Sequence, residues 1–167
     1  MPSNSDTVEL ITTKEIELFL PLMKELADDF GDPFLLSMLH WCGFGSRPAP
    51  LEFWQVFLIR TRQEIVGVSG LYRRPGSLTH LYWVGWFAIS PKFRRKGFGS
   101  AAIHGLVDHA RTIGCKELWV YTGAPDKAAR YFYTKLGFEV LGPARSHAPG
   151  QTMDDSDIVL KLRLDVY

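Results

Sequence analysis

One stretch of the chain, from Val84 to Gly99, constrains the fold more than any other. It reads VGWFAISPKFRRKGFG, an apolar strand-like run followed by a short basic loop and by glycines that open a helical pattern. The first N–H groups of a helix have no intrahelical partner, and with the positive end of the helix dipole they form an anion site. Gly97 and Gly99 carry no Cβ, so a phosphate can approach the main chain closely. The stretch therefore predicts a phosphate-binding turn.

Two motifs in this order resemble a known family. Residues 94–99, RRKGFG, match the Q/R-x-x-G-x-G/A signature of GNAT-type N-acetyltransferases, which hold the pyrophosphate of acetyl-CoA on this loop. About 30 residues further on, DKAARYFYTKLGF at 126–138 resembles the family's N-x-x-A-x-x-x-Y-x-K-L-G-F helix. The pair of motifs is much more specific than either one alone.

The resemblance implies a fold and an activity for residues 1–167 as a single domain. The expected fold is α/β (α+β), with a mixed, mostly antiparallel sheet of six or seven strands flanked by about four helices. The expected reaction is transfer of an acyl group, acetyl in the simplest case, from acetyl-CoA to a primary amine in a direct ternary complex, without a metal. The positions implied to bind the cofactor are Phe87, Ala88, Ile89, Arg94, Arg95, Lys96, Gly97, Phe98, Gly99 and Ser100.

Within this set, the resemblance assigns particular roles. Main-chain groups of Phe87 and Ile89 would bind the pantetheine arm, and an N–H near Phe87 or Ala88 would meet the thioester carbonyl. Tyr133 matches the tyrosine that often protonates the departing thiolate, although its apolar neighbours are also compatible with a packing role. The sequence departs from the family at Asp126, where Asn is common, and a helix N-cap is the better interpretation there.

The general base is less well defined. Many family members carry Glu on the strand before the loop, but residues 78–89 contain no acid. His80 is the candidate within that run, because histidine exchanges protons readily near neutral pH. The acids between Asp28 and Asp32, or water, are alternatives.

Two other functions compete with the enzyme hypothesis. A non-catalytic acyl-CoA-binding or sensing module would bind the cofactor without turnover. A dinucleotide-binding turn would use the G-x-G-x-x-A pattern at 97–102 with Glu117 about 20 residues on. The intervening residues 90–96 argue against it, because in that fold the first glycine follows its strand almost at once.

The resemblance implies acetyl-CoA and an amine acceptor as partners, and composition indicates no further class of partner. A formal net charge of +1 over 167 residues gives no strong global field, so neither nucleic acid nor a membrane is an expected partner. Two cysteines make no disulfide framework, and the amino end lacks the pattern of a signal peptide. A cytoplasmic setting is therefore expected, and a homodimer stays open.

Periodicity and turn residues predict the elements in chain order. Thr12 and Glu15 have the spacing of a helix-capping box. The expected strands are 8–11, 53–60, 65–72, 78–89, 117–122, 138–141 and 157–164, the expected helices are 13–29, 34–41, 98–113 and 126–136, and 142–156 is expected to be a polar loop.

Overall fold

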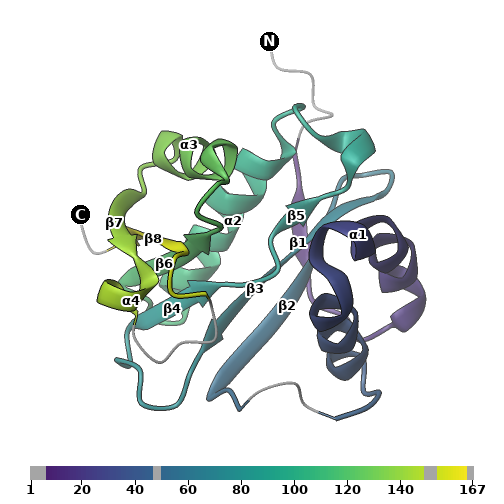
Figure 1. The fold of residues 1–167 in the computed structure, drawn as a ribbon. Coiled ribbons are helices and arrows are strands. Elements are labelled where there is room, and N and C mark those ends of the chain that lie inside the picture. The colour runs from purple at the N-terminus through teal and green to yellow at the C-terminus, as the bar shows by residue number, and fades with distance from the viewer. Residues whose placement is uncertain (1–6, 47–49, 149–153, 165–167) are drawn as a thin grey trace.

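Eight strands form one mixed sheet in the computed structural model, which describes residues 7–46, 50–148 and 154–164 (Figure 1). The strands are β1 Glu9–Ile11, β2 Phe53–Arg60, β3 Ile65–Arg73, β4 Leu81–Val84, β5 Ala88–Ile89, β6 Glu117–Thr122, β7 Glu139–Pro143 and β8 Ile158–Arg163. Their order is β1-β2-β3-β4-β6-β8-β7, with β5 paired to β3. The mostly antiparallel α/β sheet is confirmed, with one strand more than the six or seven expected.

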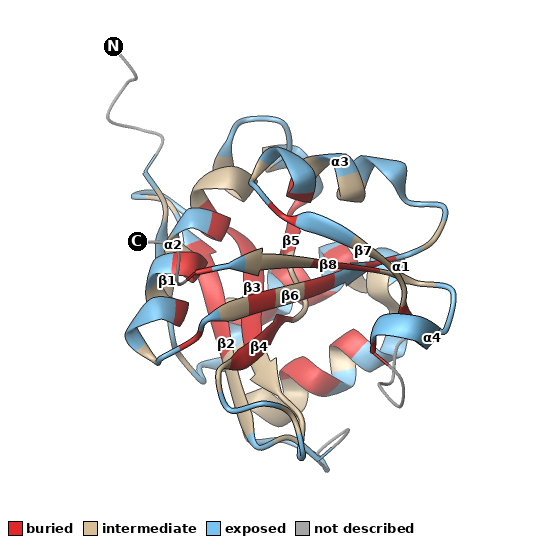
Figure 2. Cartoon of the chain, turned by 90° about the vertical axis from the view of Figure 1, so that its left-hand side faces the viewer, coloured by how far each residue is buried: buried red, intermediate tan, exposed pale blue. Residues whose placement is uncertain are grey.

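Within the described residues, four helices cover the two faces of this sheet. They are α1 Ile16–Trp41, α2 Phe98–Thr112, α3 Lys127–Lys135 and α4 Ala144–His147, and a short 3-10 turn spans Pro91–Phe93. Figure 2 shows α2 and α3 on one face and α1 and α4 on the other. The continuous apolar run of β2 follows from this arrangement, because Val56 and Leu58 pack under α1 while Phe57 packs in the core beneath α2. Strand β2 is therefore covered on both faces.

The only parallel pair among the described strands is β4 with β6. Leu81 lies opposite Glu117 and Trp83 lies opposite Trp119, and α2 makes the connection between the two strands. A parallel pair needs such a crossover because its strands run in the same direction. This β–α–β crossover brings the start of α2 to the end of β5.

The predicted strand at 78–89 is wrong in two respects: it begins only at Leu81, and it is interrupted between β4 and β5. Val84 lies opposite Leu71 and Ala88 lies opposite Val68, so three residues of this strand, 85–87, face two residues of β3. An extra residue of this kind is a β-bulge, and it re-aims the strand. Trp86 occupies the bulge with a φ of +52°. After the bulge β5 pairs with β3 and, among the described strands, not with β6.

The first helix also differs from the prediction. The expected helices 13–29 and 34–41 run on as one helix that is kinked at Gly31, where φ is +68°. Gly31 reaches this conformation without a side-chain clash, since it has no Cβ. The helix begins at Ile16, and its N-cap residue Glu15 makes no side-chain capping bond. The Thr12 capping box is therefore wrong.

The predicted polar loop at 142–156 contains regular structure at its start. β7 extends to Pro143, and α4 follows directly from Ala144. The Ala144 N–H donates to the Asp157 carbonyl at 2.7 Å, which ties the helix to the strand that follows the loop. Residues 149–153 of this loop lie outside the described residues.

Candidate active site

The turn before α2 leaves the first N–H groups of the helix open to the outside. Gly97 is the N-cap residue with a φ of +85°, and α2 has no side-chain cap. The first helical hydrogen bond runs from the Ala101 N–H to the Gly97 carbonyl at 3.1 Å. The N–H groups of Phe98, Gly99 and Ser100 precede that bond and point along the helix axis. This is the geometry of an anion site, as the sequence predicts.

The three cations of the turn differ in their surroundings. Arg95 and Lys96 are exposed and make no ion pair within the described residues. Arg94 instead donates from Nε to the Ile89 carbonyl at 2.8 Å and pairs with the Asp29 carboxylate at 2.9 Å. The charge of Arg94 is therefore already matched by the protein, whereas those of Arg95 and Lys96 are available to a ligand.

Helix α1 holds the turn at a second point. The Ser90 hydroxyl, in a residue that is 1% exposed, donates to the Glu25 carboxylate. Glu25 and Asp29 are four residues apart on one face of α1, and Ser90 and Arg94 are four residues apart in the loop. Sequence analysis missed both contacts. The four-residue spacing within each pair is visible in the sequence, but it does not show which residues of the other segment each side chain contacts.

A gap in the sheet lies next to this turn. Trp83 and Trp119 are the last residues that pair between β4 and β6. Beyond them, β6 continues to pair with β8 on its other side, while β5 pairs only with β3 among the described strands. The Ser90 N–H donates to the Val66 carbonyl of β3 at 2.8 Å. Because main-chain groups alternate in direction along a strand, the N–H of Ala88 faces β3, as that of Ser90 does, and the N–H of Ile89 faces the gap.

Tyr133 packs its ring on the face of the sheet that α2 covers. It is 6% exposed, and its ring centroid lies 5.1 Å from that of Phe132, 5.3 Å from that of Phe138 and 6.4 Å from that of Phe87. Its hydroxyl makes no hydrogen bond to a described residue, yet it is not among the fully enclosed unpaired atoms. Burial, with a smaller contribution from Asp126, raises the pKa of Tyr133, so the phenol keeps its proton at neutral pH.

Asp126 begins the helix that carries this tyrosine. Its Oδ1 accepts a hydrogen bond from the Ala129 N–H at 2.9 Å, which is the geometry of an N-cap. The N-cap interpretation of Asp126 is confirmed.

The candidate general bases do not lie next to Tyr133. The carbonyl of His80 accepts the N–H groups of Lys116 at 2.9 Å and Glu117 at 3.2 Å, which places His80 where β4 and β6 begin. The gap opens at the other ends of these strands, so the structure does not bring His80 and Tyr133 together. Asp29 is engaged with Arg94, while Asp28 and Asp32 are exposed on α1.

The bulge residue Trp86 is a site feature that sequence analysis did not predict. Its ring centroid lies 5.5 Å from those of Phe30 and Phe34, on the α1 face of the sheet. A non-glycine residue with positive φ stores backbone strain, and such residues cluster at functional sites. Gly85 was the available signal, because a glycine inside a strand often marks a bulge.

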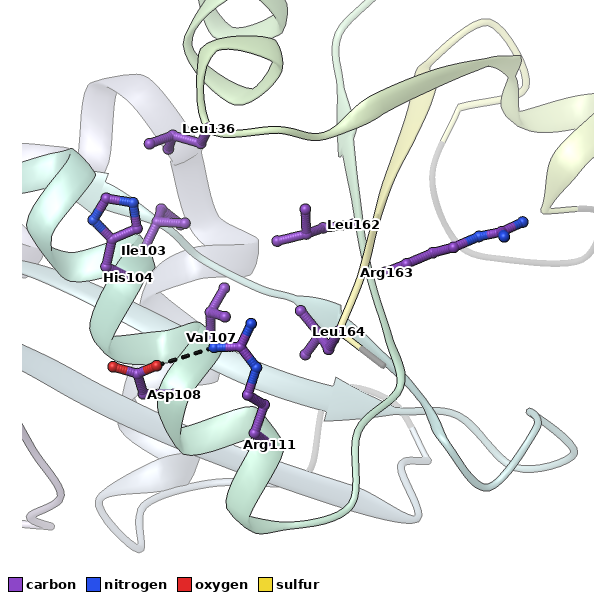
Figure 3. Close-up of a pocket in the computed structure, with 9 residues that line it drawn as sticks. All are labelled: Ile103, His104, Val107, Asp108, Arg111, Leu136, Leu162, Arg163 and Leu164. Carbon is purple, nitrogen blue, oxygen red and sulfur yellow. Dashed lines mark hydrogen bonds and ion pairs between the residues drawn. The ribbon is translucent and has the colours of Figure 1, made fainter. Parts of the chain in front are cut away.

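Two hollows lie outside this region. One of about 430 Å³ sits between α2 and the end of β8, where Leu136, Leu162 and Leu164 converge and Arg163 points away (Figure 3). The other, of about 440 Å³, lies between the first half of α1 and the β2–β3 turn. Neither is lined by Tyr133 or by a residue of 94–100. No group of three potential metal ligands occurs among the described residues.

Comparison with known proteins decides the family. The model of the Acetyltransferase (GNAT) family matches residues 17–138, which is most of the chain. The chain belongs to this family. A 53-residue stretch of this GNAT protein, 30% of its length, is 42% identical to an uncharacterized N-acetyltransferase of Methanocaldococcus jannaschii, and the match spans 23% of that relative.

Solved structures agree with the fold of this GNAT protein. A GNAT-family acetyltransferase from Staphylococcus aureus has a TM-score of 0.64 at 18% identity, with 95% of this chain and 99% of that chain covered. A GNAT-family acetyltransferase from Elizabethkingia anophelis, with acetyl-CoA bound, has a TM-score of 0.59 at 19% identity, with 97% and 100% covered. In the described part of this GNAT protein, no helix is long and apolar enough to cross a membrane.

Proposed function

We propose that residues 1–167 act as a single N-acetyltransferase domain, which transfers an acetyl group from acetyl-CoA to a primary amine of a small molecule or a protein. One observation carries the proposal: the uncapped start of α2 follows the point where the strand pairing with β6 ends, and the Tyr133 ring lies 6.4 Å from that of Phe87 at the same point. An anion site next to an interruption in the strand pairing suits a long molecule with a pyrophosphate at one end and a thioester at the other.

Acetyl-CoA, the acetyl donor, would extend from the start of α2 to the gap beside β5. The N–H groups of 98–100, with Arg95 and Lys96, would bind the pyrophosphate, while Arg94 would keep the loop in shape through Ile89 and Asp29. The Ile89 N–H would bind the pantetheine arm, which leaves the Phe87 N–H for the thioester carbonyl. The acetyl-CoA bound to the Elizabethkingia relative supports this choice of donor.

The reaction needs few groups from the protein. The neutral amine attacks the thioester carbonyl, a C–N bond forms, the C–S bond breaks and CoA leaves as a thiolate. The Phe87 N–H would stabilise charge that develops on the carbonyl oxygen. Tyr133 would donate its proton to the thiolate. Its raised pKa is compatible with this step, because a thiolate in the same apolar surroundings also becomes more basic.

The amine proton is proposed to leave through water. His80 lies at the other end of β4 and Asp29 is held by Arg94, so solvent has the least demanding geometry of the three alternatives. The rate would then follow the ionisation of the amine, because only its neutral form attacks.

The proposal is tested by a panel of amines with release of free CoA thiol as the readout, after acetyl-CoA binding is established by calorimetry. Release with at least one amine class is the expected result. Binding of acetyl-CoA without turnover for any amine would favour the sensing module instead. A cytoplasmic setting stays a prediction of the sequence, and a homodimer stays open.

A further inference from the structure

The sheet face away from Tyr133 carries a row of aromatic side chains. Trp54, Tyr72, Trp83 and Trp119 lie opposite one another in register across β2, β3, β4 and β6. The Tyr72 and Trp83 rings stack at 6.3 Å, and the Trp83 and Trp119 rings meet edge to face at 5.5 Å. Trp83, at the centre of the row, is only 2% exposed. The row therefore supports its neighbours and offers little surface to a ligand.

Tyr121 packs on this row but stays accessible. It is two residues beyond Trp119 on β6, so the two side chains share one face of the sheet. Its ring centroid lies 6.4 Å from that of Trp83, yet Tyr121 is 39% exposed. Burial of the rest, with a smaller contribution from the Asp157 carboxylate, raises the pKa of Tyr121, so the ring is uncharged at neutral pH. A neutral aromatic surface is therefore available to a ligand.

Trp86 borders the gap from the other side. The gap has β5 on one side and β6, with Tyr121, on the other. Trp86 lies in the bulge before β5 and is partly exposed. Its ring packs 5.5 Å from that of Phe30 of α1, and α1 covers the same face as α4 (Figure 2). One aromatic side chain from each side of the gap thus lies on the face opposite Tyr133.

This face is the one that the proposed function leaves to the acceptor. Phe87 and Tyr133 belong to the core beneath α2, where the thioester of acetyl-CoA would lie. An amine that attacks the thioester would then approach from the opposite face, between Tyr121 and Trp86. The two rings are therefore placed to contact the part of the acceptor that carries the amine.

We propose that the acceptor is a primary amine on a flat aromatic body, and that this body packs against the exposed part of the Tyr121 side chain. Aromatic rings prefer offset-stacked or edge-to-face contacts, which add to the gain from burying apolar area. An aliphatic polyamine has no flat face to offer, and it loses more conformational freedom on binding. Tyr121 is thus a specificity-determining residue for the acceptor. This inference rests on the proposed function.

The test measures kcat/KM with the full chain for 2-phenylethylamine, its saturated counterpart 2-cyclohexylethylamine, and 1,4-diaminobutane, with release of CoA thiol as the readout. The wild type should prefer 2-phenylethylamine over the saturated amine by about threefold to tenfold, the effect of one aromatic contact, and over the diamine by more. This comparison needs no variant.

Three variants locate the preference. Tyr121→Leu should bring the ratio of kcat/KM for the phenyl and cyclohexyl amines to about one, chiefly by raising the KM for 2-phenylethylamine, while the Kd for acetyl-CoA stays constant. Tyr121→Phe keeps the ring and should keep the preference. Tyr131→Leu is the control, because Tyr131 is 64% exposed on α3 and should leave the ratio unchanged.

Several results would overturn the inference and leave the proposed function standing. They are a wild type that turns over the saturated amine or the diamine as well as 2-phenylethylamine, a folded Tyr121→Leu variant with the wild-type ratio, and a Tyr121→Phe variant as unselective as Tyr121→Leu. Turnover of other amine classes but of none of these three would do the same. No turnover with any amine would overturn both the inference and the proposed function.

Discussion

The Asp29 carboxylate lies 2.9 Å from the Arg94 guanidinium and so joins α1 to the loop that precedes α2. The two side chains are 49% and 45% exposed, and exposed pairs of this kind contribute about 0–1 kcal/mol to the free energy of unfolding. The pair therefore matters less for stability than for the shape of the loop. It holds Arg94 against the Ile89 carbonyl, next to the gap in the sheet.

Asp29→Asn should weaken acetyl-CoA binding by about twofold to fivefold, because a loop without this anchor must be ordered when the cofactor binds. Thermal stability should change little. Asp28→Asn is the matched control, since it removes the same charge one residue earlier from an exposed position. The measurement is a calorimetric titration of acetyl-CoA into both variants. Equal affinities in the two variants would show that the Asp29–Arg94 pair does not prepare the loop.

Tyr133→Phe should lower turnover by roughly 100- to 10,000-fold, the usual effect of a positioned general acid, while acetyl-CoA affinity stays nearly constant. The ring remains, so its packing against Phe132 and Phe138 should survive. Tyr131→Phe, on the exposed side of the same helix, is the control. A Tyr133→Phe enzyme that keeps more than half its turnover, with chemistry rate-limiting, would make Tyr133 a packing residue.

His80→Gln should change kcat/KM by less than about twofold, because His80 lies where β4 begins and the gap opens where it ends. With water as the base, kcat/KM should rise with pH only as the substrate amine loses its proton. No second rise that reports the deprotonation of an imidazole should be seen. The measurement is a pH–rate profile of wild type and variant. An acidic limb near neutral pH that disappears in the variant would restore His80 as the general base.

Much of the fold follows from local sequence patterns. The turn residues between β2 and β3 predict a hairpin. Apolar residues at helical spacing predict α2, and Gly114 predicts where it ends. The phosphate turn is also predictable, because its strand, glycines and helix are contiguous in the chain. In each case the interactions that stabilise the element lie within a few residues of one another.

The remaining features depend on contacts between distant residues. The bulge at Trp86 arises from a mismatch in length between two paired strands, which β4 and β5 alone do not reveal. The bonds from Arg94 to Asp29 and from Ser90 to Glu25 each join residues that are 65 positions apart. Composition and spacing carry no signal for such relationships.

Calorimetric titration of acetyl-CoA into wild type and Gly99→Glu tests the central claim most directly. A Cβ at Gly99 would lie 3.4 Å from the Phe132 ring, so a glutamate there places bulk and negative charge beside the start of α2. The control, His104→Glu, adds the same charge at an exposed position on the same helix. We predict saturable binding to the wild type, a Kd at least about tenfold higher in Gly99→Glu and about unchanged in His104→Glu. Equal affinity in a folded Gly99→Glu variant, or no binding to the wild type, would contradict the assignment of the α2 start as the cofactor site.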